Sequence, residues 1–169
     1  TCFPVFCLSA LRNMGSGRLM GFIDNVAPSA IEMPDEKTED GTNLSCTVDG
    51  PTVLFTFKTV IEPRAGHITL FKVMRGEVQE GMELVNENTG NTERVNQLFI
   101  VDGKERIHVN KLQAGDIGGT IKLKDTATAH TLHAPGKAIK LQPIAFPSPR
   151  LRQVIKAVEQ KQEEKLHAA

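Results

Sequence analysis

The feature that most constrains the fold is a series of short β-like runs that begins after Pro51 and is broken repeatedly by turn residues. In the first run Val53, Phe55 and Phe57 fall at every second position, as on one face of a strand. The later apolar runs cover residues 68–75, 82–85, 95–101, 117–123, 131–132 and 139–141. About six or seven such strands predict a mainly β chain with a closed antiparallel β-barrel, because closure removes exposed strand edges.

Local details of these runs predict where the barrel bends. The apolar alternation slips between Leu70 and Phe71, which predicts a bulge or a strand buried on both faces. Residues 86–91 form a predicted hairpin loop in which Gly90 supplies a positive φ. Further turns are expected at residues 102–104 and 113–116, and Gly118-Gly119 predicts close backbone approach.

The segments on either side of this region have a different character. Residues 3–8 are a short apolar run that predicts a buried strand. From Ser16, an expected N-cap, apolar residues at helical spacing predict a helix that ends before Pro28. Residues 31–50 carry charge, Pro and Gly without an apolar period and predict an exposed linker or long loop. After a proline-rich junction, residues 152–158 predict a strand and 160–169 the start of a helix.

Length and composition limit the kind of protein without selecting its function. The chain has 169 residues, which fits one domain or one domain with partial neighbours. No apolar run approaches the roughly 20 residues of a membrane span, and no secretory signal opens the chain. Three cysteines, Cys2, Cys7 and Cys46, are interpreted as reduced thiols. We therefore expect a cytoplasmic protein with no membrane partner. The missing initiator Met and the apolar first residues predict a cut piece of a longer chain.

Motifs for catalysis and metal binding are largely missing from this sequence. There is no GxxxxGK[ST], GxSxG or HExxH, and the glycines at 15 and 17 lack the lysine of a phosphate loop. We expect no catalytic residues and no enzyme activity of the chain by itself. His130 and His133 have metal-like spacing, but no further ligand lies close in sequence, so no metal is predicted.

Basic residues gather around one predicted strand. They are Arg64, His67, Lys72 and Arg75, with Lys104 and Arg106 on a later turn. Several cations on one surface can contact nucleic-acid phosphates, although the 20 basic and 20 acidic residues of the chain balance. The alternative is an ordinary solvated barrel face. Tyr and Trp are absent, so RNA would be recognised by shape and phosphate contacts.

An ordered series of motifs resembles the elongation factor G family of translational GTPases. Residues 63–76, PRAGHITLFKVMRG, resemble the segment that opens the second domain of that family. The segments 81–86, 93–95, 112–117 and 123–126 follow in the family order. The resemblance implies an elongation factor domain II β-barrel.

The flanking segments resemble the neighbouring domains of the same family. Residues 4–11, PVFCLSAL, resemble the last strand of a translational G domain, in which Ser9, Ala10 and Leu11 would be the remnant of the guanine-binding site. Segments 146–149 and 163–166 resemble the entry to the third domain. The implied organisation is an α/β end of the G domain in 1–30, a linker or loop in 31–50, the domain II barrel in 51–142, and the start of an α+β domain III in 143–169.

The resemblance also implies a function. The barrel would contact small-subunit ribosomal RNA, with Arg64, His67, Lys72 and Arg75 as candidate contacts, and would couple the GTPase domain to ribosome binding during translocation. The parent would hydrolyse GTP and bind GTP or GDP with Mg, whereas the fragment would hold no cofactor. The expected partners are the ribosome and the remaining domains of the parent, with no DNA and no membrane.

One departure from the family pattern leaves alternatives open. The usual Thr-Gly-Asp-Thr-Leu is replaced around Ala129 and His130, where the sequence reads ATAHTL. This replacement indicates a paralogue, and a ribosome-protection protein or a relative of release factor 3 remains an alternative. A β-barrel protein-interaction module that binds no RNA is the alternative from another class.

Overall fold

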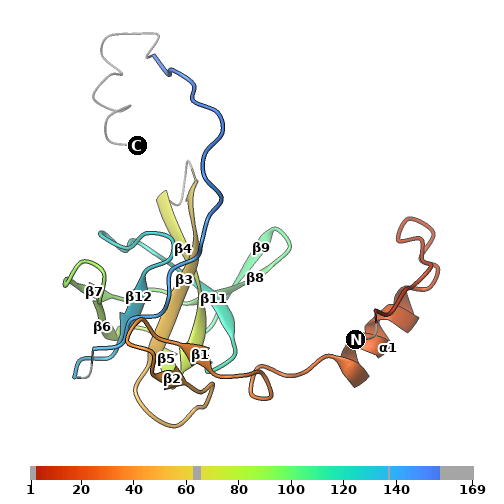
Figure 1. Ribbon diagram of the computed structural model, residues 1–169, viewed down its shortest axis with the longest axis horizontal. Helices are drawn as coiled ribbons and strands as arrows, with labels where there is room; N and C mark the ends of the chain where they lie inside the picture. Colours follow the sequence, from red (N-terminus) through yellow and green to blue (C-terminus); the bar gives the residue numbers. More distant parts are fainter. Residues whose placement is uncertain (1–2, 63–65, 137, 157–169) are drawn as a thin grey trace.

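The computed structural model, which describes residues 3–62, 66–136 and 138–156, confirms a mainly β chain (Figure 1). Short strands make up the part after Pro51, and one helix precedes them among the described residues. In chain order the elements are α1 (Ser16–Val26), β1 (Glu36–Lys37), β2 (Asn43–Leu44), β3 (Val53–Glu62), β4 (Gly66–Arg75), β5 (Glu77–Gln79), β6 (Glu83–Asn86), β7 (Thr92–Arg94), β8 (Phe99–Asp102), β9 (Glu105–His108), β10 (Lys111–Gln113), β11 (Ile117–Ile121) and β12 (Thr131–His133).

The main sheet has eight antiparallel strands in the order β7-β6-β12-β3-β4-β11-β8-β9. Two smaller sheets pair β1 with β2 and β5 with β10. The strands β7 and β8 stand near opposite ends of this order, yet only residues 95–98 join them. Such a short connection spans at most about 18 Å. The sheet must therefore curl until its two ends approach each other.

The predicted closed barrel is not found, because no ladder joins β7 to β9 within the described residues. The short connection 95–98 has no room to reverse and form another strand. It makes single bonds instead: Gly81 N–H donates to the carbonyl of Val95 at 2.6 Å, and Val109 N–H donates to that of Leu98 at 3.0 Å. The β5–β10 pair contributes Val78 and Leu112 to the core beside this gap. Side-chain packing therefore shields the core where a strand ladder is missing.

One hydrophobic core lies inside the curled sheet and draws on nearly every strand. Its buried members are Leu54, Phe71, Val73, Val78, Leu84, Val95, Leu98, Leu112, Leu123 and Leu132. Side chains alternate in β3 as predicted, but the face in this core carries Leu54 and Thr56, whereas Phe55 and Phe57 of the apolar series point to the opposite face and are half-buried. Leu54 therefore lies on the face of β3 that contacts this core, and Phe55 lies on the outer face.

A bulge was predicted between Leu70 and Phe71, and the structure has one opposite these residues, with the extra residue on β3 instead of β4. Thr56 pairs with Phe71 while Lys58 pairs with Leu70, so Phe57 is an additional residue on β3 between those two pairs. Insertion of one residue bends a strand and increases its twist. A second shift occurs between Val53 and Leu54, at the end of the ladder where Val53 pairs with Arg75. These irregularities help the two longest strands to curl around the core.

The predicted turns are confirmed as well. The 86–91 loop joins β6 to β7, and Gly90 has a φ of 75°, in the left-handed region where glycine is favoured. Residues 102–104 join β8 to β9, and residues 113–116 lead from β10 into β11. These reversals were predictable because each depends on residues adjacent in sequence.

The segment before α1 differs from its prediction. Residues 3–8 were expected to form a buried strand, but they form no strand, and Phe3 and Val5 are 82% and 88% exposed. A strand needs a hydrogen-bonding neighbour, and none lies beside this run in the part of the chain that the structure describes. The helix α1 is confirmed, although its N-cap is Gly15 instead of Ser16. An α/β remnant of a G domain is therefore not shown.

Residues 31–50, expected to be an exposed linker or long loop, pack partly against the sheet. They contain β1 and β2, and both Thr38 and Leu44 are buried. Thr38 forms an isolated bridge with Leu141, and Glu39 N–H donates to the carbonyl of Lys140 at 2.8 Å. The two segments that flank the β region in sequence thus lie side by side across its outer face.

The last described residues, 143–156, contain no strand and are exposed. The strand predicted over 152–158 is therefore absent in its described part, and the predicted helix at 160–169 lies outside the described residues. No helix in the described part of the chain is long and apolar enough to cross a membrane.

Candidate functional site

A groove lies on the outer face of the sheet, where β3, β4 and β11 run side by side. Phe55, Lys72 and Ile117 are direct partners across these three strands and form one row of side chains. Directly paired residues of an antiparallel sheet point to the same face. The hollow has a volume of about 510 Å³. It is lined by Asp35, Glu36, Lys37, Phe55, Phe57, Lys72, Met74, Ile117, Leu141 and Gln142.

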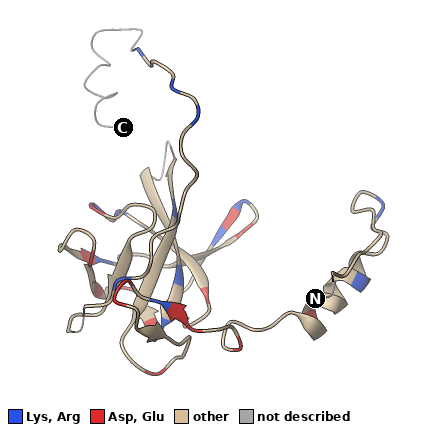
Figure 2. Ribbon diagram, in the orientation of Figure 1, with Lys and Arg blue, Asp and Glu red and all other residues tan. Residues whose placement is uncertain are grey.

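The floor of this groove is apolar and its rim is charged. Phe55, Phe57 and Met74 are apolar lining residues, whereas the lining residues Glu36 and Lys37 belong to β1, whose ribbon is coloured as charged in Figure 2. Lys72 is the cation of the central row, and it makes no ion pair with any described residue. The groove can therefore accept an apolar group, and its charged lining residues are two carboxylates, Asp35 and Glu36, and two ammonium groups, Lys37 and Lys72.

The structure does not gather the predicted RNA-contacting residues into one cluster. Arg64 lies outside the described residues. His67 is exposed near the start of β4, and Arg75 ends the same strand, about 26 Å away at 3.3 Å per residue. Arg75 Nε donates to the carbonyl of Asp49 at 3.2 Å and lines a separate hollow of about 200 Å³. Lys72 alone of the predicted set lines the groove.

The predicted guanine-binding remnant forms a tight turn before α1. Ser9 N–H donates to the carbonyl of Met14 at 3.0 Å, so the first of the predicted backbone donors is occupied. Ala10 and Leu11 have no backbone acceptor among the described residues, and Leu11 is 97% exposed. The two amides after Ser9 remain available to an external acceptor. The role of Ser9, Ala10 and Leu11 stays a prediction.

A polar cluster that the sequence did not predict lies beneath the 86–91 loop. Glu93 is buried, and its two carboxylate oxygens accept bonds from Asp125 N–H at 2.7 Å, Lys124 N–H at 3.1 Å and the Thr126 hydroxyl at 3.0 Å. Backbone amides that lie more than 30 positions away in the chain are thus fixed by one side chain. Glu93 lies within a short polar stretch of the sequence, so no local pattern marks it as buried.

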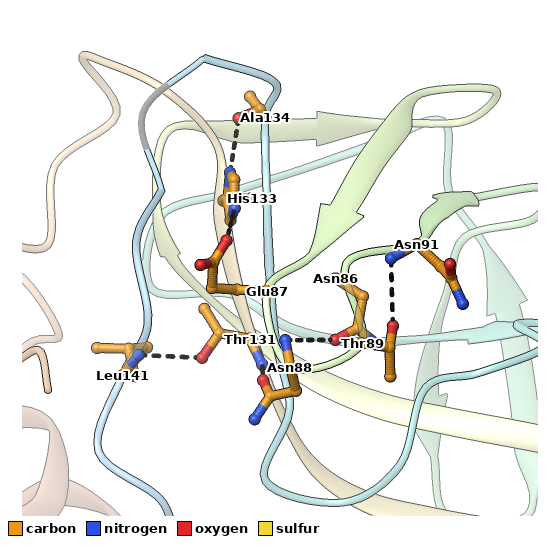
Figure 3. A network of polar contacts seen from close by, with 9 residues as sticks. All are labelled: Asn86, Glu87, Asn88, Thr89, Asn91, Thr131, His133, Ala134 and Leu141. Atoms are coloured by element: carbon orange, nitrogen blue, oxygen red, sulfur yellow. Dashed lines mark hydrogen bonds and ion pairs between the residues drawn. The ribbon is translucent and has the colours of Figure 1, made fainter.

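The two histidines with metal-like spacing take part in separate contacts. His133 is buried, with Nε2 2.9 Å from a carboxylate oxygen of Glu87 and Nδ1 2.8 Å from the carbonyl of Ala134 (Figure 3). Both ring nitrogens of His133 therefore lie within hydrogen-bonding distance of an oxygen. His130 lies nearer Asn86 and has a lowered pKa, because burial disfavours the charged form and Lys140 adds a like charge. No group of three metal-ligating side chains occurs among the described residues.

The loop above this cluster is held by side chains of its own residues. Asn88 N–H donates to Asn86 Oδ1 at 3.0 Å, and Asn88 Oδ1 accepts the N–H of Thr131 at 3.0 Å (Figure 3). The hydroxyl of Thr131 in turn accepts the N–H of Leu141 at 3.1 Å. These bonds connect the β6–β7 loop through β12 to the segment that borders the groove.

Comparison with known proteins relates the strand region to translation factors. Residues 66–133 match the family described as Elongation factor Tu domain 2. The chain is 33% identical to elongation factor G 1 of Bdellovibrio bacteriovorus over 98% of its own length and 24% of that protein. It is 31% identical to elongation factor G of Alteromonas mediterranea, over 99% of this chain and 25% of that protein. The chain thus spans about a quarter of the length of these relatives.

A solved structure supports the same fold. A crystal structure of a protein from Thermus thermophilus superposes with a TM-score of 0.70 at 23% identity, covering 95% of this chain and 22% of that one. Such identity shows the fold alone, whereas the sequence relatives cover nearly the whole chain at higher identity. The chain therefore belongs to the elongation factor G family, and residues 66–133 are its elongation factor Tu domain 2.

Proposed function

We propose that this chain is the domain II region of an elongation factor G-like GTPase, and that its strand region contacts small-subunit ribosomal RNA. The observation that carries the proposal is the similarity to elongation factor G over 98% of the chain. The whole protein would bind GTP or GDP with Mg and hydrolyse GTP through parts outside this chain. The strand region would couple that GTPase part to the ribosome during translocation.

Lys72 is the side chain best placed to contact a phosphate. It stands in the middle of the Phe55–Lys72–Ile117 row and makes no ion pair with a described carboxylate, although Asp35 and Glu36 line the same groove. A lysine that contacts a phosphate releases a counterion on binding, which makes affinity depend on salt concentration. His67 and Arg75 would act at the two ends of β4, as separate contacts along an extended RNA backbone.

Binding to isolated small ribosomal subunits tests this proposal. The Lys72→Gln variant should bind more weakly than wild type, and its slope of log affinity against log salt should be lower by about 1. Lys124→Gln is the matched control, because Lys124 is exposed and away from the groove. Equal affinity and equal salt slope for Lys72→Gln and wild type would contradict the proposed contact.

A protein-interaction module is the second candidate, and the groove floor favours it. Phe55, Phe57 and Met74 form an apolar surface that suits a protein side chain better than a phosphate. On this alternative, Phe57→Ser would abolish binding of a protein partner, whereas salt would have little effect. Salt-insensitive binding to subunits, lost on Phe57→Ser and unaffected by Lys72→Gln, would favour it over RNA contact.

A further inference from the structure

The turn between β11 and β12 is held by buried polar contacts to β3. The hydroxyl of Thr56, which is fully buried, donates toward the carbonyls of Ala127 at 2.7 Å and His130 at 2.9 Å, and accepts the N–H of His130 at 3.0 Å. Ala129 N–H donates to the carbonyl of Thr56 at 2.7 Å. Ala129 has a φ of 69°, a left-handed conformation that costs a non-glycine residue free energy. The turn therefore depends on its hydrogen bonds.

His130 completes this turn with one ring nitrogen. Its Nδ1 accepts the N–H of Ala127 at 3.2 Å and lies 3.1 Å from Nδ2 of Asn86. Both neighbours are donors, so Nδ1 must carry a lone pair, and the proton of the neutral ring must be on Nε2. Protonation of Nδ1 would place three donors against one another.

Asn86 cannot readily avoid that conflict. It is fully buried, and its Nδ2 group also faces the carbonyl of Asp125 at 3.3 Å and the hydroxyl of Thr126 at 3.2 Å. Its Oδ1 accepts the N–H of Asn88, which fixes the orientation of the amide. Protonated Nδ1 would point a donor at this amide nitrogen, and Asn86 cannot turn its oxygen toward the ring without giving up the bond from Asn88. Protonation of His130 would therefore loosen the turn and the β6–β7 loop together.

We propose that residues 127–130 form an acid-sensitive latch, which neutral His130 keeps closed between β3 and the β6–β7 loop and which protonation of Nδ1 releases. The device couples two surface segments that the chain separates by about 40 positions. Release would disturb Asn86 and then the loop that Asn86 holds.

The charged groups around the latch are consistent with a neutral histidine. Lys140 faces His130 and, after burial itself, is the second cause of its lowered pKa. The carboxylates on neighbouring elements have donors of their own: Asp125 accepts from Asn91, and Glu93 accepts from the 124–126 backbone. Glu87, in the loop after β6, pairs with His133, and Glu39 pairs with Lys140. No described carboxylate pairs with the His130 ring.

The sign of the pH effect follows from the direction of the pKa shift. The pKa of His130 is lower in the folded chain than its ordinary value of 6.5. Between those two values the unfolded chain binds more protons, so stability rises with pH. The contribution is complete above the unfolded pKa and decreases as pH falls below it, by at most about tenfold in the folding constant per pH unit.

Urea unfolding of the 169-residue chain from pH 8 to pH 5 tests the latch, with His130→Asn as the comparison. Asparagine offers Oδ1 in place of Nδ1 and does not titrate. The folding constant of wild type should fall relative to that of His130→Asn below about pH 6.5, by up to about tenfold per pH unit. All other titratable groups are the same in the two proteins, so the difference between their pH profiles reports on His130. Parallel pH profiles for wild type and variant would overturn the proposal.

A spectroscopic measurement on the wild-type chain makes the test independent of how the variant folds. Nitrogen-15 spectra of the His130 ring should show the proton on Nε2 at about pH 7.5, above the ordinary histidine pKa, and the exchange protection of the Ala127 amide should fall as the ring titrates. A neutral ring with its proton on Nδ1 would overturn the proposal. So would an Ala127 amide whose protection does not change across the titration.

Discussion

Replacing Gly119 by alanine should destabilise the sheet, because this residue lies between two close neighbours. Gly119 pairs with Phe99 of β8 on one side and with Leu70 of β4 on the other. An added Cβ would stand 2.6 Å and 2.7 Å from two atoms of the Phe99 ring and 3.0 Å from a Leu70 methyl. Phe99 is 5% exposed, so its ring has little space to move away.

The expected magnitude combines two opposing effects. Overpacking a filled site costs roughly 1–3 kcal/mol. Replacing a glycine also stabilises the folded state by about 0.4–1 kcal/mol, because the unfolded chain has less conformational entropy to lose on folding. Since Gly119 has an ordinary strand backbone, no further cost arises from φ. Gly119→Ala should therefore lower the free energy of unfolding by about 1–2 kcal/mol.

Urea unfolding monitored by circular dichroism measures this change, and two further variants locate its cause. Gly21→Ala in α1 is the matched control, because no atom lies within 4 Å of the added Cβ, and it should not destabilise the chain. Phe99→Leu removes the ring atoms nearest Gly119, so the double variant should cost less than the sum of the single variants. A Gly119→Ala chain as stable as wild type, or strict additivity with Phe99→Leu, would refute the overlap.

Three other substitutions test separate parts of the fold. Glu93→Gln should lower the free energy of unfolding by about 1–3 kcal/mol, because an amide nitrogen would face backbone donors; an unchanged urea midpoint would contradict this. Ala129→Gly should raise the free energy of unfolding by about 1 kcal/mol, because glycine avoids the roughly 1–2 kcal/mol that the left-handed backbone costs alanine, which exceeds the entropic cost of glycine. A lower free energy of unfolding for this variant would argue against backbone strain at Ala129. Leu84→Ala should lower the free energy of unfolding by about 2–5 kcal/mol, because it opens a cavity in the core. A decrease of less than about 1 kcal/mol, measured by thermal unfolding, would contradict a buried position of Leu84 in the core.

Features of the fold that depend on neighbouring residues were predictable from sequence. The apolar spacing of α1, the alternation in β3, the slip at Leu70 and Phe71, and the 86–91 loop are all local patterns. The resemblance to elongation factor G extended the prediction to the family, which the comparisons confirm. Backbone geometry and family membership thus required no knowledge of distant contacts.

Features that depend on distant partners were not predictable. The run at residues 3–8 has the composition of a buried strand but lies beside no strand in the described chain, so it stays exposed. No ladder joins the end strands β7 and β9 of the sheet within the described part of the chain, which strand counting cannot reveal. The short strands β1 and β2 pair with each other, and the adjacent Thr38 bridges to Leu141, whereas the sequence of this segment has no β-like pattern.

The candidate site shows the same division. Lys72 was predicted as a cation on the β4 strand, and its place in a groove between Phe55 and Ile117 follows only from strand pairing. Glu93 gave no signal, because the amides that it holds come more than 30 positions later. His130 was noted for its spacing to His133, whereas the structure separates the two rings into different networks.

Photo-crosslinking from the groove to the ribosome tests the central claim most directly. A benzophenone amino acid at Ile117, which is 58% exposed at the groove rim, would report what lies against this face in the bound complex. A second probe at Ile107 on β9, 44% exposed and outside the groove, is the comparison. The account predicts crosslinks from position 117 to small-subunit ribosomal RNA that exceed those from position 107. Crosslinks from position 117 only to proteins, or only to the large subunit, would contradict it.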